Sequence, residues 1–113
     1  MSTRHFKRQI EKIESQIKEH ASFQCSLLKN PISTMDVDRL ADFTQTVANK
    51  TDNLLSMSYI LDKIEGIPRW WQISLKAEHD WSKRSIIELT ENYSVINDLI
   101  VDRLEELREG RIS

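Results

Sequence analysis

The chain has 113 residues, of which 18 are acidic and 16 basic, and it contains only two glycines and two prolines. A chain of this length can build one core, and this composition favours a single all-helical domain over a disordered or β-rich protein. The slight negative charge excludes a general attraction to nucleic acid, and no apolar run reaches the roughly 20 residues that a membrane-spanning helix needs. One cysteine excludes an internal disulfide, and no signal segment opens the chain, so we expect a cytoplasmic protein without a membrane partner.

The first predicted helix covers residues 4–29 and is amphipathic. Its apolar side chains recur at steps of three and four residues, the spacing of one helix face: Phe6, Ile10, Ile13, Ile17, Ala21, Cys25 and Leu28. This spacing places Ile10, Ile13 and Ile17 in the core and predicts that Cys25 is a core thiol. Basic residues outnumber acidic ones here. Because the acids are interleaved at helical spacing, a solvated face is favoured over a nucleic-acid-binding regulator that uses this helix.

The second predicted helix covers residues 35–65. Pro31 ends the helix before it, and either Ser33 or Thr34 can cap the new one. A seam with heptad spacing follows, and three of its eight members carry a hydroxyl group: Val37, Leu40, Thr44, Val47, Thr51, Leu54, Ser58 and Leu61. Gly66 lies just after the last periodic residue, as expected at the C-terminus of a helix. Short connections predict antiparallel neighbours in up-down-up order.

The third predicted helix covers residues 68–109, with Pro68 in its first turn. Its apolar residues again follow one helix face: Ile86, Leu89, Tyr93, Ile96, Ile100, Leu104 and Leu107. This helix is longer than the other two, and antiparallel pairing places the start of the second helix near Asp98. The residues after Asp98 are therefore expected to overhang the three-helix bundle and to pair with a second copy. The predicted dimer interface consists of Ile96, Leu99, Ile100, Leu104 and Leu107.

A break in this long helix is the alternative to an overhang. Ser82 could cap a new helix, and the apolar stripe changes face between Trp81 and Ile86. A break near Asp80–Ser85 would give a closed four-helix bundle.

Three tryptophans form the predicted partner-binding site. Trp70 and Trp71 are adjacent, so on a helix their side chains point about 100° apart and cannot both face one core. One of the two is expected to be buried and the other to be exposed as an anchor for a partner. Trp81, together with Arg69, which could stack on a tryptophan ring, completes the predicted site.

Candidate chemical groups lack the sequence patterns that catalysis or metal binding needs. His79 lies between Glu78 and Asp80, which leaves open a phosphotransfer protein, although the basic residue and glycine expected after a phosphohistidine are missing. Two glutamate pairs, each with its members about one helical turn apart, could hold magnesium in a hydrolase: Glu88 with Glu91, and Glu105 with Glu109. Each would need a second acidic pair on a facing helix. We therefore assign no catalytic residue, no metal and no cofactor.

These observations predict a non-enzymatic protein–protein interaction module that works as a helical homodimer. An adaptor, a chaperone-like factor, an inhibitor or a regulator would each fit this description. The partner is expected to be another protein, because the apolar residues after Asp98 and the tryptophan cluster are not needed for the core and are typical of protein interfaces. The alternatives are a phosphotransfer protein or magnesium-dependent hydrolase, and a nucleic-acid-binding regulator.

Overall fold

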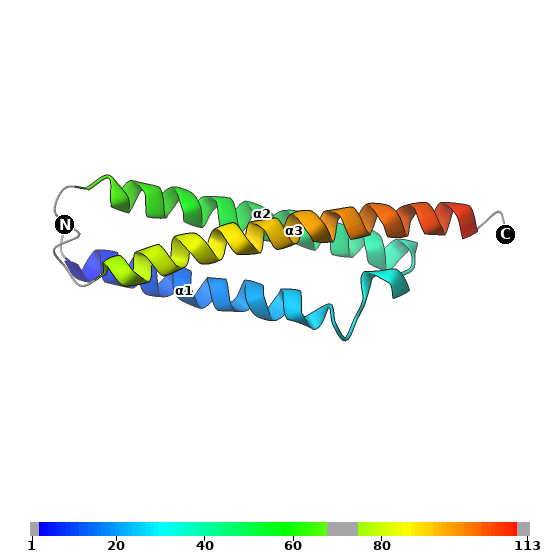
Figure 1. Cartoon of the computed structure of the whole chain (residues 1–113), viewed down its shortest axis with the longest axis horizontal. Coiled ribbons are helices and arrows are strands. Elements are labelled where there is room, and N and C mark those ends of the chain that lie inside the picture. The colour runs from blue at the N-terminus through cyan, green and yellow to red at the C-terminus, as the bar shows by residue number, and fades with distance from the viewer. Residues whose placement is uncertain (1–2, 68–74, 111–113) are drawn as a thin grey trace.

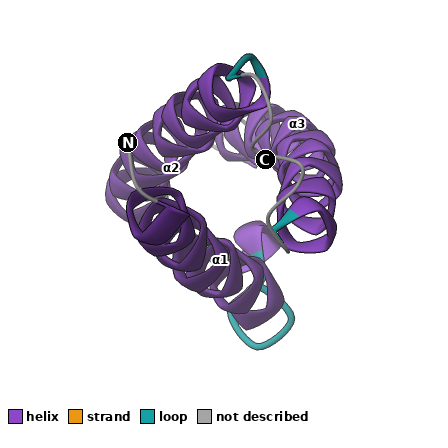
Figure 2. Cartoon of the chain, turned by 90° about the vertical axis from the view of Figure 1, so that its left-hand side faces the viewer, coloured by secondary structure: helices purple, strands orange, loops and turns teal. Residues whose placement is uncertain are grey.

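Three long helices and one short 3₁₀ helix account for most of residues 3–67 and 75–110, the part of the chain that the structure describes. The computed structural model contains these elements in the order α1 (Thr3–Ser26), η1 (Ile32–Thr34), α2 (Val37–Glu65) and α3 (Lys76–Gly110). Figure 1 shows α1 and α3 running in one direction and α2 in the other, and Figure 2 shows the three helices around a common axis. The predicted all-α three-helix bundle with up-down-up topology is confirmed.

The connection between α1 and α2 is longer than the sequence predicts. α1 ends at Ser26, earlier than expected, and a turn and η1 follow before α2 begins at Val37. Asp36 is the N-cap of α2, because its Oδ1 accepts a hydrogen bond of 2.8 Å from the backbone N–H three residues later. The expectation of a cap at Ser33 or Thr34 is therefore wrong, since both residues belong to η1.

α3 runs without a break over 35 residues. The alternative of a break near Asp80–Ser85 is wrong, because His79 and Ser82 are buried and continue the core-facing stripe of the helix up to Ile86. The predicted start of this helix at Pro68 lies outside the described residues. The bundle that the structure describes therefore has three long helices rather than four.

The buried apolar side chains form one cluster along the bundle. α1 contributes Phe6, Ile10, Ile13 and Ile17, as predicted. The other two helices contribute Leu40, Val47, Leu54, Met57, Leu61 and Ile64 from α2, and Ile86, Leu89, Tyr93, Ile96 and Ile100 from α3. Full burial of each such side chain stabilises the fold by roughly 1.5–3 kcal/mol, so the three helices hold one another in place.

The overhang at the end of α3 is shorter than predicted. Ile96 and Ile100 are only 6% and 7% exposed, and both belong to the core. The connection before α2 explains this burial, because Ile32 and Met35 are part of the same cluster and extend the core beyond the end of α1. The Nε of Arg103 also donates a hydrogen bond of 2.9 Å to the backbone O of Met35. α3 is therefore covered well past the point at which the sequence predicts that it leaves the bundle.

Candidate functional site

The apolar face of α1 divides after Ile17. His20, three residues after Ile17, faces the core. Ala21, four residues after Ile17, faces the surface, as do Cys25 and Leu28. Cys25 is exposed, so the prediction of a core thiol is wrong. The end of α1 therefore presents apolar side chains on a face that its own bundle does not cover.

These side chains form one wall of a groove between α1 and α3, which we term the α1–α3 groove. It has a volume of about 670 Å³. Its first wall consists of Ile17, Lys18, Ala21, Gln24, Cys25, Leu27 and Leu28, and its second wall of Trp81, Ser85, Glu88, Leu89, Asn92, Val95, Ile96 and Leu99. Ten of these 15 residues are apolar, so the groove is mainly a carbon surface.

The polar side chains at the centre of the groove bind one another. Nε2 of Gln24 donates to the backbone O of Leu89 at 3.0 Å, and Oε1 of Gln24 accepts from Nδ2 of Asn92 at 3.0 Å. Both ends of the glutamine amide are thereby used, and Gln24 and Leu89 are held at the same height along the bundle. The groove consequently offers a ligand chiefly apolar contact.

Four large apolar side chains of the groove are exposed to solvent. Leu28 is 85% exposed, Val95 58%, Leu99 47% and Trp81 37%. A single exposed apolar residue is common on protein surfaces, whereas several large ones that line the same groove are typical of a surface used for interaction. Trp81 adds the kind of aromatic side chain that most often dominates the energy of a protein interface.

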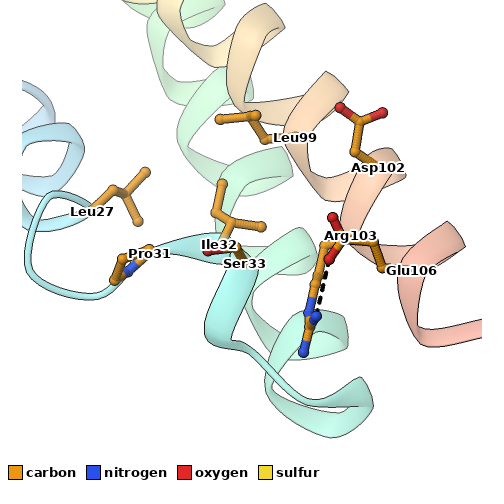
Figure 3. A pocket seen from close by; sticks show the side chains of 8 residues that line it. All are labelled: Leu27, Pro31, Ile32, Ser33, Leu99, Asp102, Arg103 and Glu106. Atoms are coloured by element: carbon orange, nitrogen blue, oxygen red, sulfur yellow. Dashed lines mark hydrogen bonds and ion pairs between the residues drawn. The ribbon is translucent and has the colours of Figure 1, made fainter. Parts of the chain in front are cut away.

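A second pocket, of about 270 Å³, continues the groove toward the C-terminal end of α3 and shares Leu27 and Leu99 with it. Figure 3 shows Asp102, Arg103 and Glu106 of α3 on one side of this pocket and the connection before α2 on the other. Nη1 of Arg103 lies 3.1 Å from Oε2 of Glu106. The apolar groove therefore ends in a charged pocket in which acids outnumber bases.

A buried hydrogen-bond network joins the three helices. His20 of α1 is 4% exposed, with Nε2 2.7 Å from Oδ1 of Asn53 in α2 and Nδ1 2.7 Å from the hydroxyl of Tyr93 in α3. An amide oxygen only accepts, so Nε2 donates to Asn53 and Nδ1 accepts from Tyr93. Burial raises the pKa of Tyr93 to about 12, which keeps this hydroxyl protonated at neutral pH. Both ring nitrogens of His20 are thereby used inside the bundle.

Two carboxylates approach each other where α1 meets the start of α3. Burial raises the pKa of Glu14 above its ordinary value of 4.5, and the charge of Glu78 raises it further, while Lys18 acts in the opposite direction. Oε2 of Glu78 is buried and makes no hydrogen bond within the described part of the chain. Burial and the charge of Glu78 therefore both disfavour the ionised form of Glu14.

The structure describes only part of the predicted partner-binding site. Trp81 lines the α1–α3 groove, as a partner-binding residue would. Arg69, Trp70 and Trp71 fall within residues 68–74 and lie outside the described residues.

The predicted dimer-interface residues do not share one surface. Leu99 lines both the groove and the pocket at its end, Leu104 is exposed, and Leu107 is partly buried against the core. Ile100 faces the core of its own chain, and Ile96, which also lines the groove, is only 6% exposed. Because η1 and its neighbours cover α3 at this height, Ile96 and Ile100 are not available to a second copy in the way that the predicted overhang requires.

The α1 wall of the groove is not evident from the sequence. The spacing of four and three residues between Ala21, Cys25 and Leu28 is that of a core-facing stripe. His20, which takes the place of Ala21 in the core, is polar and therefore does not look like a core residue. Val95 was not predicted as a site residue because it lies off the main apolar stripe of α3. The signal that could have found this wall is the unusual width of the apolar stripe on α1 after Ile17.

His79, the candidate residue of the phosphotransfer alternative, lies inside the bundle. His79 is fully buried, and its Nε2 donates a hydrogen bond of 2.9 Å to the backbone O of Leu61, so its imidazole is not exposed to a phosphoryl donor. Within residues 3–67 and 75–110, no group of three or more histidine, cysteine or acidic side chains is placed to hold a metal ion. The same stretches contain no helix with the length and apolar content needed to cross a membrane.

Comparisons of the chain with models of protein families, with curated proteins and with solved structures find no match.

Proposed function

We propose that this chain is a non-enzymatic protein–protein interaction module that binds an amphipathic helix in the α1–α3 groove. The observation that carries the proposal is the set of exposed large apolar side chains that line one groove, three of them on α3 and one in the turn after α1. An amphipathic helix fits such a surface, because side chains at steps of three and four residues can enter the space between two helices. A cytoplasmic adaptor, chaperone-like factor, inhibitor or regulator would act through such a contact.

The dimensions of the groove indicate the length of helix that it accepts. Trp81 and Leu99 mark its two ends on α3 and are 18 residues apart. At 1.5 Å per residue this is about 27 Å, or five turns of a bound helix. Because Gln24 and Asn92 already bind each other, the bound helix would gain its affinity from apolar side chains and its orientation from charges at the ends.

Site-specific photo-crosslinking tests this proposal. A photoreactive amino acid replaces Leu28 or Val95 in the groove, or Leu55 on α2 as a matched control, since Leu55 is also exposed and lies outside the groove. Each variant is irradiated in extract of the source cells, and the cross-linked peptides are identified by mass spectrometry. We expect amphipathic helical peptides at both groove positions and few at Leu55. Cross-links that are equally frequent at all three positions would contradict the proposal.

The contribution of the tryptophan can be measured separately. Trp81→Ala is expected to weaken binding of the cross-linked partner peptide by about 2 kcal/mol or more, the usual scale for a tryptophan anchor. Tyr59→Ala serves as the control, because Tyr59 is 60% exposed on α2 and does not line the groove. Equal losses from the two variants would mean that the groove is not the binding surface.

A further inference from the structure

We propose that the partner that covers the α1–α3 groove is a second copy of this chain, whose own α1 and α3 pack over it, and that two copies meet groove to groove in antiparallel orientation. This inference rests on the proposed function and names the partner for it. It moves the expected homodimer from the end of α3, where the core covers Ile96 and Ile100, to the face that remains open. The arrangement is a two-fold one, in which each copy offers the same surface to the other.

The two ends of the groove carry opposite charge. At the end where α1 begins, residues 4–18 hold five basic side chains and two acidic, and residues 76–84 at the start of α3 add three basic and two acidic. At the end where α3 finishes, residues 98–109 hold five acidic side chains and two basic, and Asp102 and Glu106 line the pocket there. An antiparallel pair brings each basic end to the acidic end of the other copy. A parallel pair would bring like charges together, which costs binding energy.

The positions of individual charged residues along the bundle axis fit a two-fold axis at the centre of the groove. The hydrogen bond of 3.0 Å from Gln24 to the backbone O of Leu89 sets a common height on α1 and α3. Lys7 lies 17 residues before Gln24, and Glu106 lies 17 residues after Leu89. Both are therefore about 25 Å from this height, in opposite directions. A two-fold axis through it places Lys7 of each copy level with Glu106 of the other.

The same axis matches the apolar side chains. Trp81 lies eight residues before Leu89, while Val95 and Leu99 lie six and ten residues after it. In the antiparallel pair, Trp81 of one copy is therefore level with the space between Val95 and Leu99 of the other. All three side chains are exposed in a single copy and would be covered in the pair.

One contact in this arrangement is unfavourable, and its removal tests where the two-fold axis lies. Glu88 lines the groove one residue before Leu89, so two Glu88 carboxylates approach each other near the two-fold axis. Glu88→Gln removes this repulsion and is expected to tighten the dimer. A partner of different sequence would have no reason to place a second carboxylate at this position.

Two lysines at the basic end provide a matched pair for the test. Lys7 lies 11 residues, about three helical turns, before Lys18 and so shares the groove face of α1. Lys12 lies four and seven residues before Gln16 and Glu19, which line a separate pocket against α2. Both lysines are exposed, and only Lys7 would meet a second copy.

Sedimentation velocity of the purified full chain at low ionic strength tests the inference. We expect a dimer that Lys7→Glu weakens by about tenfold or more, that Lys7→Glu combined with Glu106→Lys restores, and that Lys12→Glu leaves unchanged. Circular dichroism confirms that each variant remains folded. Equal effects of Lys7→Glu and Lys12→Glu, or no rescue by the charge exchange, would overturn the proposed pairing.

Thiol cross-linking tests the orientation. In a Cys25→Ser background, Lys7→Cys and Glu106→Cys chains are mixed and treated with a short bismaleimide. The antiparallel pair predicts cross-links between the two kinds of chain, whereas predominant cross-linking of Lys7→Cys chains to each other would overturn it. A monomeric wild-type chain at high micromolar concentration would also overturn it. Groove cross-links to a different protein in the extract would then leave the proposed function standing, and their absence would remove both.

Discussion

The hydroxyl of Tyr93 in α3 lies 2.7 Å from Nδ1 of His20 in α1, although the two residues are 73 positions apart in the sequence. Asn53 of α2 binds the other nitrogen of the ring at 2.7 Å, so one imidazole touches all three helices. A buried polar group costs stability unless it is hydrogen-bonded, and His20 satisfies this condition only when the helices have this relative height. We infer that the network fixes the register in which the α1–α3 groove forms.

Removing the tyrosine hydroxyl tests the role of this network. Tyr93→Phe leaves Nδ1 of His20 buried without its donor, and we expect a loss of about 1–3 kcal/mol in the free energy of unfolding. Chemical denaturation followed by circular dichroism measures the loss. Tyr59→Phe is the control, because Tyr59 is 60% exposed and should change stability very little. Equal effects of the two substitutions would show that His20 does not depend on Tyr93.

The raised pKa of Tyr93 predicts a specific loss of stability in alkali. The phenol ionises near pH 10 in the unfolded chain and near pH 12 in the bundle, so its contribution is complete below pH 10 and falls as the pH rises from 10 to 12. Ion pairs with Glu65 and Asp62 raise the pKa of Lys83 above its ordinary value of 10.5, so Lys83 also loses its charge in alkali. The comparison is therefore between wild type and Tyr93→Phe, which share Lys83. The wild type should lose more stability than the variant, and parallel curves would contradict the prediction.

Glu14 predicts an effect on the acid side. Its pKa is raised in the folded state, so its contribution is complete below the ordinary value of 4.5 and is lost as the pH rises through the folded-state value. Glu14→Gln should therefore be more stable than wild type at pH 7, by less than about 1 kcal/mol because the site is partly exposed, and the gain should vanish near pH 4. Glu19→Gln on the exposed side of α1 is the control. A gain that does not change with pH would exclude the contact with Glu78 as its cause.

The sequence was sufficient for the architecture because the signals that end helices are local. Pro31 and Gly66 mark the two connections, and the periodic apolar residues between them leave only helices as elements. The length of the first connection was not predictable in the same way. Ile32 and Met35 look like isolated apolar residues in a turn, and their place in the core appears only when α3 lies beside them.

The groove could not be predicted for a different reason. At Ile17 the apolar face of α1 can continue to His20 or to Ala21, and hydrophobicity alone favours Ala21. The core contains His20 because Asn53 and Tyr93 satisfy its ring nitrogens from other helices. Partners that are 33 and 73 positions away are not visible in a local pattern. Once His20 faces inward, Ala21 and the apolar residues after it must face the groove.

At the end of α3, the predicted overhang and the observed core lead to different expected effects of substitutions on stability and association. Ile100→Ala should cost about 2–5 kcal/mol, as expected for a large-to-small change in a packed core, whereas Leu104→Ala should cost under about 1 kcal/mol. Ile100 is 7% exposed and Leu104 45% exposed, one turn further along the same helix. Thermal and chemical unfolding measure the stability, and sedimentation measures association. Because Leu104 does not line the α1–α3 groove, its truncation should leave association unchanged. Loss of a dimer in Leu104→Ala without loss of stability would instead restore the end of α3 as the interface.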